Sequence, residues 1–149
     1  MANLVGARIE RKEDKKFLTG KGRYTADINL GNQTYAYFVR SPHARAKIKK
    51  VDISKASKAS GVVSVLTGAD IVKDKIGGLI AGWKIVSEDG SDMKVPAHPP
   101  LASDTVNYVG DHVAVVIAES LDEAKAAANL VEVDYKVLQA VTSTADAMK

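Results

Sequence analysis

The chain of 149 residues contains no cysteine, and only 4 prolines, 2 phenylalanines and 1 tryptophan. Without a thiol it has no disulfide framework, no thiolate zinc site, no iron–sulfur ligand and no cysteine nucleophile. We therefore expect any redox centre that works with this chain to be bound elsewhere in an assembly. The apolar fraction of 46% and the charged fraction of 26% are those of an ordinary globular domain.

Long hydrophobic runs and a dominant charge are also absent. The longest apolar run, residues 113–118, is too short to cross a bilayer, and no secretory signal is visible at the start of the chain. We therefore expect a cytoplasmic protein without membrane contact. The net charge of +3 comes from 21 basic and 18 acidic residues, which gives no strong field for nucleic acid. The basic stretches lack interleaved aromatic residues, so we expect no nucleic-acid partner.

Motifs for catalysis or phosphate binding are not complete anywhere in the sequence. The glycines around Lys21 do not have the spacing of a phosphate-binding loop, and no nucleophile elbow occurs. The histidines His43, His98 and His112 are isolated from one another and from other metal-ligand residue types. We interpret all three as structural, and assign no catalytic, cofactor-binding or metal-ligating residue to this chain.

The first part of the chain predicts an arm and then a strand. Residues 1–34 show no sustained hydrophobic period and are punctuated by glycines, which indicates an extended arm. Residues 35–39 are aromatic and β-branched, as in a strand, and Ser41-Pro42 would end that strand at a corner. A shift in the apolar alternation predicts a β-bulge near Lys49-Lys50.

The middle of the chain is less regular. Residues 54–60 favour a short helix closed by Gly61, and residues 62–66 favour a buried strand. Thr67 and Asp70 have the spacing of a capping box that opens a further helical turn. Residues 73–100 are rich in glycine and proline but too apolar for a free linker, so we expect a hairpin excursion packed on something.

The last third predicts a strand-helix-strand unit. Residues 113–118 read as a central buried strand, Ser120 and Glu123 as the capping box of a helix, and residues 131–135 as an alternating strand. Ser143 is expected to cap one closing helical turn. The fold class is therefore α+β, with a mixed sheet in residues 35–149 that follows the N-terminal arm of residues 1–34.

Ordered fragments along nearly the whole chain carry a family resemblance. They are Gly6-x-Arg8, Arg11-x-Glu13-Asp14, Phe17-Leu18-Thr19-Gly20-x-Gly22-Arg23-Tyr24, Arg40-Ser41-Pro42-His43-Ala44, Leu66-Thr67-Gly68-Ala69-Asp70, Tyr108-Val109-Gly110 and Val131-x-Val133-Asp134-Tyr135. In this the chain resembles the start of the large molybdenum-binding subunit of the xanthine dehydrogenase, aldehyde oxidase and aerobic carbon monoxide dehydrogenase family. In that family this region is the α/β hammerhead domain.

The resemblance implies a structural and docking role within a molybdenum hydroxylase, with the chain as a hammerhead domain or a separately encoded subunit. The complete enzyme would be an oxidoreductase that uses molybdopterin, iron–sulfur clusters and FAD, none of them held by this chain. The partners would be the remainder of the molybdenum-binding subunit and the flavin or iron–sulfur subunits. The family's cofactor-binding segments and glutamate base would lie beyond Lys149, so the isolated chain is expected to be inactive.

The chain departs from the family pattern at Arg45, where histidine is usual, and at His112, where proline is usual. The residues that we expect to dock a partner are Phe17, Arg23, Tyr24, Arg40 and Arg45. The alternative hypothesis is a freestanding binding module that uses its basic arm for an anionic partner, since fold does not fix function. A small hydrolase built on His43 or His112 is a third alternative.

Overall fold

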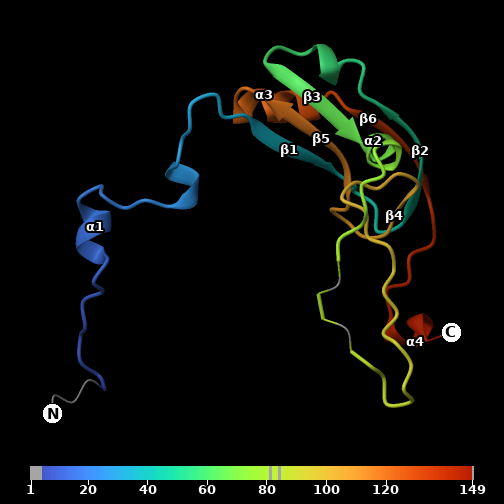
Figure 1. Cartoon of the computed structure of the whole chain (residues 1–149), viewed down its shortest axis with the longest axis horizontal. Coiled ribbons are helices and arrows are strands. Elements are labelled where there is room, and N and C mark those ends of the chain that lie inside the picture. The colour runs from blue at the N-terminus through green and yellow to red at the C-terminus, as the bar shows by residue number, and fades with distance from the viewer. Residues whose placement is uncertain (1–4, 81, 84, 149) are drawn as a thin grey trace. The chain divides into compact units, whose positions relative to one another are not determined.

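A computed structural model of the chain describes residues 5–80, 82–83 and 85–148 (Figure 1). The chain divides between Gln33 and Thr34 into two units. The first unit contains a short helix, α1 (Asp14–Leu18), and a single 3-10 turn, η1 (Thr25–Asp27). The segment that we expected to be an extended arm therefore contains one short helix and one 3-10 turn. The five residues of α1 are too few to show a hydrophobic period, so this helix could not be predicted from the sequence pattern.

One antiparallel sheet of three strands forms the first layer of the second unit. Its order is β1 (Tyr35–Arg40), β5 (His112–Ala118) and β3 (Val62–Thr67). β5 pairs with both neighbours and is buried along most of its length. A central strand is covered on both faces, which explains why its sequence is a continuous apolar run and not an alternation.

The second sheet is also antiparallel, in the order β4 (Thr105–Val106), β2 (Ala46–Asp52) and β6 (Glu132–Val137). Its register shifts between Ile48 and Lys50, so the predicted bulge is confirmed. The single mixed sheet that we expected is replaced by two antiparallel sheets. The physical reason is that the helix after β5 carries the chain into the other sheet, so the strands that flank it never pair.

The α+β class and the strand-helix-strand succession are confirmed. Helix α3 (Leu121–Ala128) lies against the sheet of β1, β5 and β3 and buries Ala124, Ala127 and Ala128 (Figure 1). The hydroxyl of Ser120 accepts a hydrogen bond from the backbone N–H of Glu123 at 3.2 Å, as the capping box predicted. The closing turn α4 (Thr144–Ala147) begins after Ser143, whose hydroxyl accepts from the Asp146 N–H at 3.1 Å.

The connection on each side of β3 follows its predicted turn chemistry only in part. Residues 54–60 form no α-helix but a single 3-10 turn, η2 (Ala56–Lys58), which Gly61 follows with a φ of 71°. Helix α2 (Gly68–Lys73) begins as expected. The Asp70 carboxylate accepts from the Thr67 backbone N–H at 2.7 Å and from the Thr67 hydroxyl at 2.8 Å. These bonds lower the pKa of Asp70.

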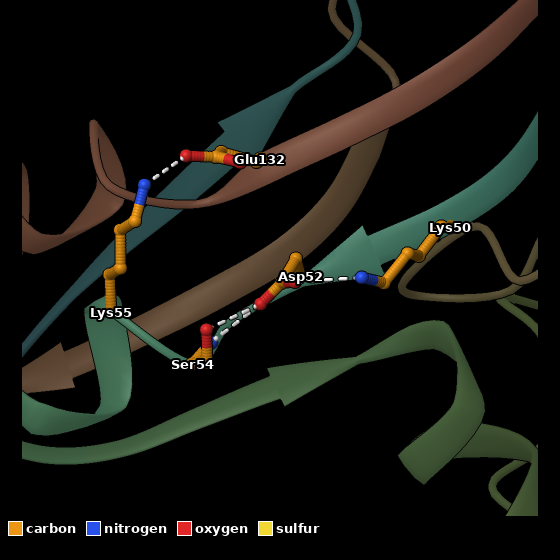
Figure 2. A network of polar contacts seen from close by, with 5 residues as sticks. All are labelled: Lys50, Asp52, Ser54, Lys55 and Glu132. Atoms are coloured by element: carbon orange, nitrogen blue, oxygen red, sulfur yellow. Dashed lines mark hydrogen bonds and ion pairs between the residues drawn. The ribbon is translucent and has the colours of Figure 1, made fainter.

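A polar network fixes the turn that leaves β2 (Figure 2). The carboxylate of Asp52 accepts from Lys50 at 2.8 Å and from both the N–H and the hydroxyl of Ser54 at 3.0 and 2.7 Å. The bond from Lys50 and those from Ser54 hold the pKa of Asp52 far below its usual range. Lys55, which follows, pairs with Glu132 of β6 at 2.5 Å. The acidic groups of this network are occupied by neighbours of the same chain, so it has a structural role.

Candidate functional site

Clusters able to hold a metal ion are the first kind of site to consider. Within the part of the chain that the structure describes, no three side chains among His, Asp and Glu gather closely enough to bind one. In the same residues no helix is long and apolar enough to cross a membrane.

The corner after β1 is where the sequence placed His43. Ser41 is buried, and its hydroxyl accepts from the His43 N–H and donates to the His43 carbonyl, each at 3.0 Å. The backbone of Ser41 donates to the Asp111 carbonyl at 2.8 Å. The ring of His43 then packs edge-on against Tyr135, with 5.0 Å between ring centroids. These contacts confirm that the segment turns a corner and give His43 a structural position.

The other two histidines also contact aromatic rings. His112 stacks on Phe38 with ring centroids 4.4 Å apart, and His98 shares a hydrogen bond of 3.0 Å with the Tyr108 hydroxyl. Burial, and then the nearby charge of Arg40, lower the pKa of His112, so the ring stays neutral at physiological pH. The hydrolase alternative was built on His43 or His112, and the ring contacts of both are with aromatic side chains, Tyr135 and Phe38, which gives that alternative no support.

The first unit brings two of the expected docking residues together. Phe17 at the end of α1 and Tyr24 before η1 stack with ring centroids 5.4 Å apart and an interplanar angle of 7°. Both side chains are exposed, at 41% and 65%. A Cβ atom at Gly22 would lie only 2.4 Å from the Phe17 ring, so glycine at this position makes room for the stack. Arg23, between them in sequence, is exposed as well.

The other two docking candidates lie in the second unit and already have partners there. The Arg40 guanidinium donates to the Gly110 carbonyl at 3.2 Å, beside the corner. The Arg45 guanidinium donates to the Gln139 carbonyl at 3.4 Å. Each contact uses one of the five N–H groups of a guanidinium, so both arginines keep donors for a partner.

The feature that sequence reasoning missed is the surface of residues 76–100, which we call the excursion. It is a hairpin, as expected, with an antiparallel bridge between Val86 and Asp92. The packing that its apolar residues predicted is not found among the described residues: Ile80 is 92% exposed and Trp83 is 79% exposed. Apolar composition alone predicts buried residues, so the sequence did not indicate that these side chains are exposed.

A cleft of about 400 Å³ lies where the excursion meets the turn before β5. Leu79, Ile80 and Val95 form its apolar wall, and His98 and Tyr108 lie at its polar side. Burial is the main cause that raises the pKa of Tyr108, so its hydroxyl stays protonated.

Comparison with known proteins identifies the domain. A family model described as the a/b hammerhead domain of aldehyde oxidase and xanthine dehydrogenase matches residues 19–139. The chain therefore belongs to this family of hammerhead domains, as its sequence fragments indicated.

Its relatives are much longer than the chain itself. The large subunit of nicotine 6-hydroxylase from Paenarthrobacter nicotinovorans is 41% identical over 93% of this chain and 16% of that subunit. The carbon monoxide dehydrogenase large chain of Afipia carboxidovorans is 35% identical over 97% of this chain and 17% of its own length. The chain thus spans about a sixth of the length of the curated relatives it matches.

A solved structure supports the same assignment. Quinoline 2-oxidoreductase from Pseudomonas putida 86 matches with a TM-score of 0.82 and 35% identity, over 97% of this chain and 18% of that chain. This chain is thus a hammerhead domain that corresponds to one part of the large subunits of molybdenum hydroxylases. The relatives named as large subunits or large chains belong to assemblies of several subunits.

The residues of this chain do not supply the ligands of an iron–sulfur cluster. Iron–sulfur clusters are held by cysteine thiolates, and the sequence has no cysteine. The described residues offer no cluster of His, Asp and Glu for a metal. We therefore derive no catalytic step from this domain.

Proposed function

We propose that this hammerhead domain has a structural and docking role in a molybdenum hydroxylase of the xanthine, aldehyde or carbon monoxide dehydrogenase type. Its partner is the rest of the large subunit. By this we mean the polypeptide that corresponds to the regions of the relatives that this chain does not cover. The flavin and iron–sulfur subunits are further partners. Molybdopterin, iron–sulfur clusters and FAD belong to the complete enzyme, and a cytoplasmic location stays a prediction.

The observation that carries the proposal is the exposed stack of Phe17 on Tyr24. The first unit has no buried residue in α1 or η1, so the stack belongs to no hydrophobic core of its own unit. Aromatic residues that lie together on a surface are typical anchors of protein interfaces, because their burial releases a large apolar area from water. Family membership supplies the partner for which such an anchor is suited.

Charge around the stack favours a protein partner over a nucleic acid. Arg11 pairs with Asp14 at 3.1 Å within the same unit, and the Asp27 carboxylate accepts from the Tyr24 N–H at 2.8 Å. Acidic groups among the basic ones would repel a phosphate backbone. On a protein surface the same mixture of charges fixes how the two proteins align. Arg23, Arg40 and Arg45 are additional donors to the partner.

The test is co-purification of the chain with the rest of the large subunit. We expect the double variant Phe17→Ala/Tyr24→Ala to lose co-purification while β5 and α3 stay folded, as judged by circular dichroism. The matched control is Val5→Ala/Leu30→Ala, which removes two exposed apolar side chains of the same unit and should bind as the wild type does.

Two results would contradict the docking role. One is undiminished binding by the aromatic double variant. The other is tight binding of duplex DNA by the wild-type chain at physiological salt, which would favour the freestanding module with an anionic partner.

A further inference from the structure

The excursion of residues 76–100 carries several exposed apolar side chains. Its outward side chains include Ile80 and Trp83, together with further aliphatic residues: Ile76, Leu79, Ile85, Val86 and Val95. Contiguous apolar patches of more than a few hundred Å² are rare on proteins that act alone and mark interaction sites. The described residues of the excursion contribute no strand to either of the two sheets.

Backbone bonds nevertheless give the excursion a definite form. At its base the Leu79 N–H donates to the His98 carbonyl at 2.8 Å, and near its tip the Met93 N–H donates to the Ile85 carbonyl at 3.2 Å. The Ser87 N–H donates to the Ser91 carbonyl at 2.9 Å beyond that. The hairpin runs away from both sheets and returns to β4 (Figure 1). A two-stranded hairpin without a covered face is only marginally stable in water.

We propose that the excursion is a second docking element, and that its apolar face and the cleft at its base are covered by the rest of the large subunit. The inference rests on the proposed function. The occupant follows from the comparisons: the match to quinoline 2-oxidoreductase spans 97% of this chain, so the excursion lies inside it, yet only 18% of that chain. The excursion therefore belongs to a domain whose relatives contain additional polypeptide of about five times the length of the domain.

The cleft defines what the partner inserts. Its wall of Leu79, Ile80 and Val95 suits an aliphatic or aromatic side chain, and its volume of about 400 Å³ accommodates one or two of them. The His98–Tyr108 hydrogen bond already joins the polar groups at its edge. The Asp111 carboxylate, which also lines the cleft, accepts from the Asn107 backbone N–H at 3.0 Å. Because these polar groups already have partners, the apolar wall favours an apolar protein segment over a charged ligand.

Trp83 makes this testable because it is the only tryptophan of the chain. The chain is labelled with 5-fluorotryptophan, mixed with the unlabelled rest of the large subunit, and followed by ¹⁹F NMR with a soluble paramagnetic quencher. We expect one resonance that broadens strongly with quencher in the free chain and is protected in the complex. Ile80→Asp should weaken the complex on the order of tenfold or more, as removal of an interface anchor does.

The matched control is Val63→Asp on the edge strand β3, where the valine is 60% exposed but lies outside the excursion. It should bind within about twofold of the wild type, as surface changes outside an interface do. A complex in which Trp83 stays as accessible as in the free chain would overturn this inference and leave the arm's docking role intact. Protection in the chain alone that increases with concentration would overturn it too, because a second copy would then be the occupant. No complex at all would overturn both proposals.

Discussion

Replacement of Gly68 by alanine should destabilise the second unit through one local collision. Gly68 is the first residue of α2 and is buried. A Cβ atom there would lie 2.3 Å from the carbonyl oxygen of Ala102 and 2.5 Å from the Cα of Ser103. Ordinary contacts are longer than about 3.4 Å, so α2 and the segment of Ala102 must separate by about 1 Å.

The segment that would have to move is itself fixed. The Ala102 N–H donates to the His112 carbonyl at 2.7 Å, and its side chain packs in the cluster with Val106 and Val113. Forced overpacking in such surroundings costs about 1–3 kcal/mol, and the better helix propensity of alanine returns less than about 1 kcal/mol of this. We expect Gly68→Ala to lower the unfolding free energy by about 2 kcal/mol, which is a fall of about 4–8 °C in Tm for a chain of this length.

The assay is thermal unfolding followed by far-UV circular dichroism, with urea unfolding as a second measurement. The control is Gly77→Ala, since a Cβ at Gly77 has no atom within 4 Å and the residue has no positive φ. That variant should stay within about 0.5 kcal/mol of the wild type. If Gly68→Ala and Gly77→Ala both have the same Tm and urea midpoint as the wild type, the close approach of α2 to Ala102 is wrong.

The remaining predictions concern caps and pH. Ser120→Ala should lose about 1 kcal/mol in urea unfolding, because α3 loses its N-cap; an unchanged midpoint would contradict that helix start. Asp70→Ala should have a lower unfolding free energy than the wild type at pH 7. This difference should shrink as the pH falls below about 4, because the lowered pKa of Asp70 contributes stability only while the carboxylate is ionised. A difference that does not change with pH would refute this. The lowered pKa of His112 means that the unfolded chain takes up the proton more readily, so stability should fall as pH drops below about 6.5, and His112→Gln should reduce that fall. If the unfolding free energy of both proteins falls equally with pH, His112 is not the cause of the fall.

Sequence reasoning succeeded where the signal is local. The cap at Ser120 needs only the residues that follow it, and the corner at Ser41-Pro42 needs only the missing donor of proline. The continuous apolar run of β5 predicted a strand covered on both faces. The bulge near Lys49-Lys50 appeared as a slip in the alternation, because side chains of a strand change face at every residue.

It failed where the outcome depends on distant partners. Which strands pair is decided across tens of residues, so two antiparallel sheets were not distinguishable from one mixed sheet. The stack of Phe17 on Tyr24 depends on space that glycine leaves at position 22, and neither residue type signals it alone. The exposed face of the excursion could not be inferred, because apolar residues that pack inside a chain and those that pack on another chain have the same composition.

The strand pairings have a consequence for the chain as a connected object. Each of the four pairings among the described strands joins a strand that precedes the excursion, β1, β2 or β3, to one that follows it, β4, β5 or β6. The domain is thus two interleaved halves that share both sheets, and the excursion is their covalent link. A single cut by a protease near Gly90 would therefore leave a nicked molecule held together by both sheets, and two separately made halves would form a natural pair for fragment complementation.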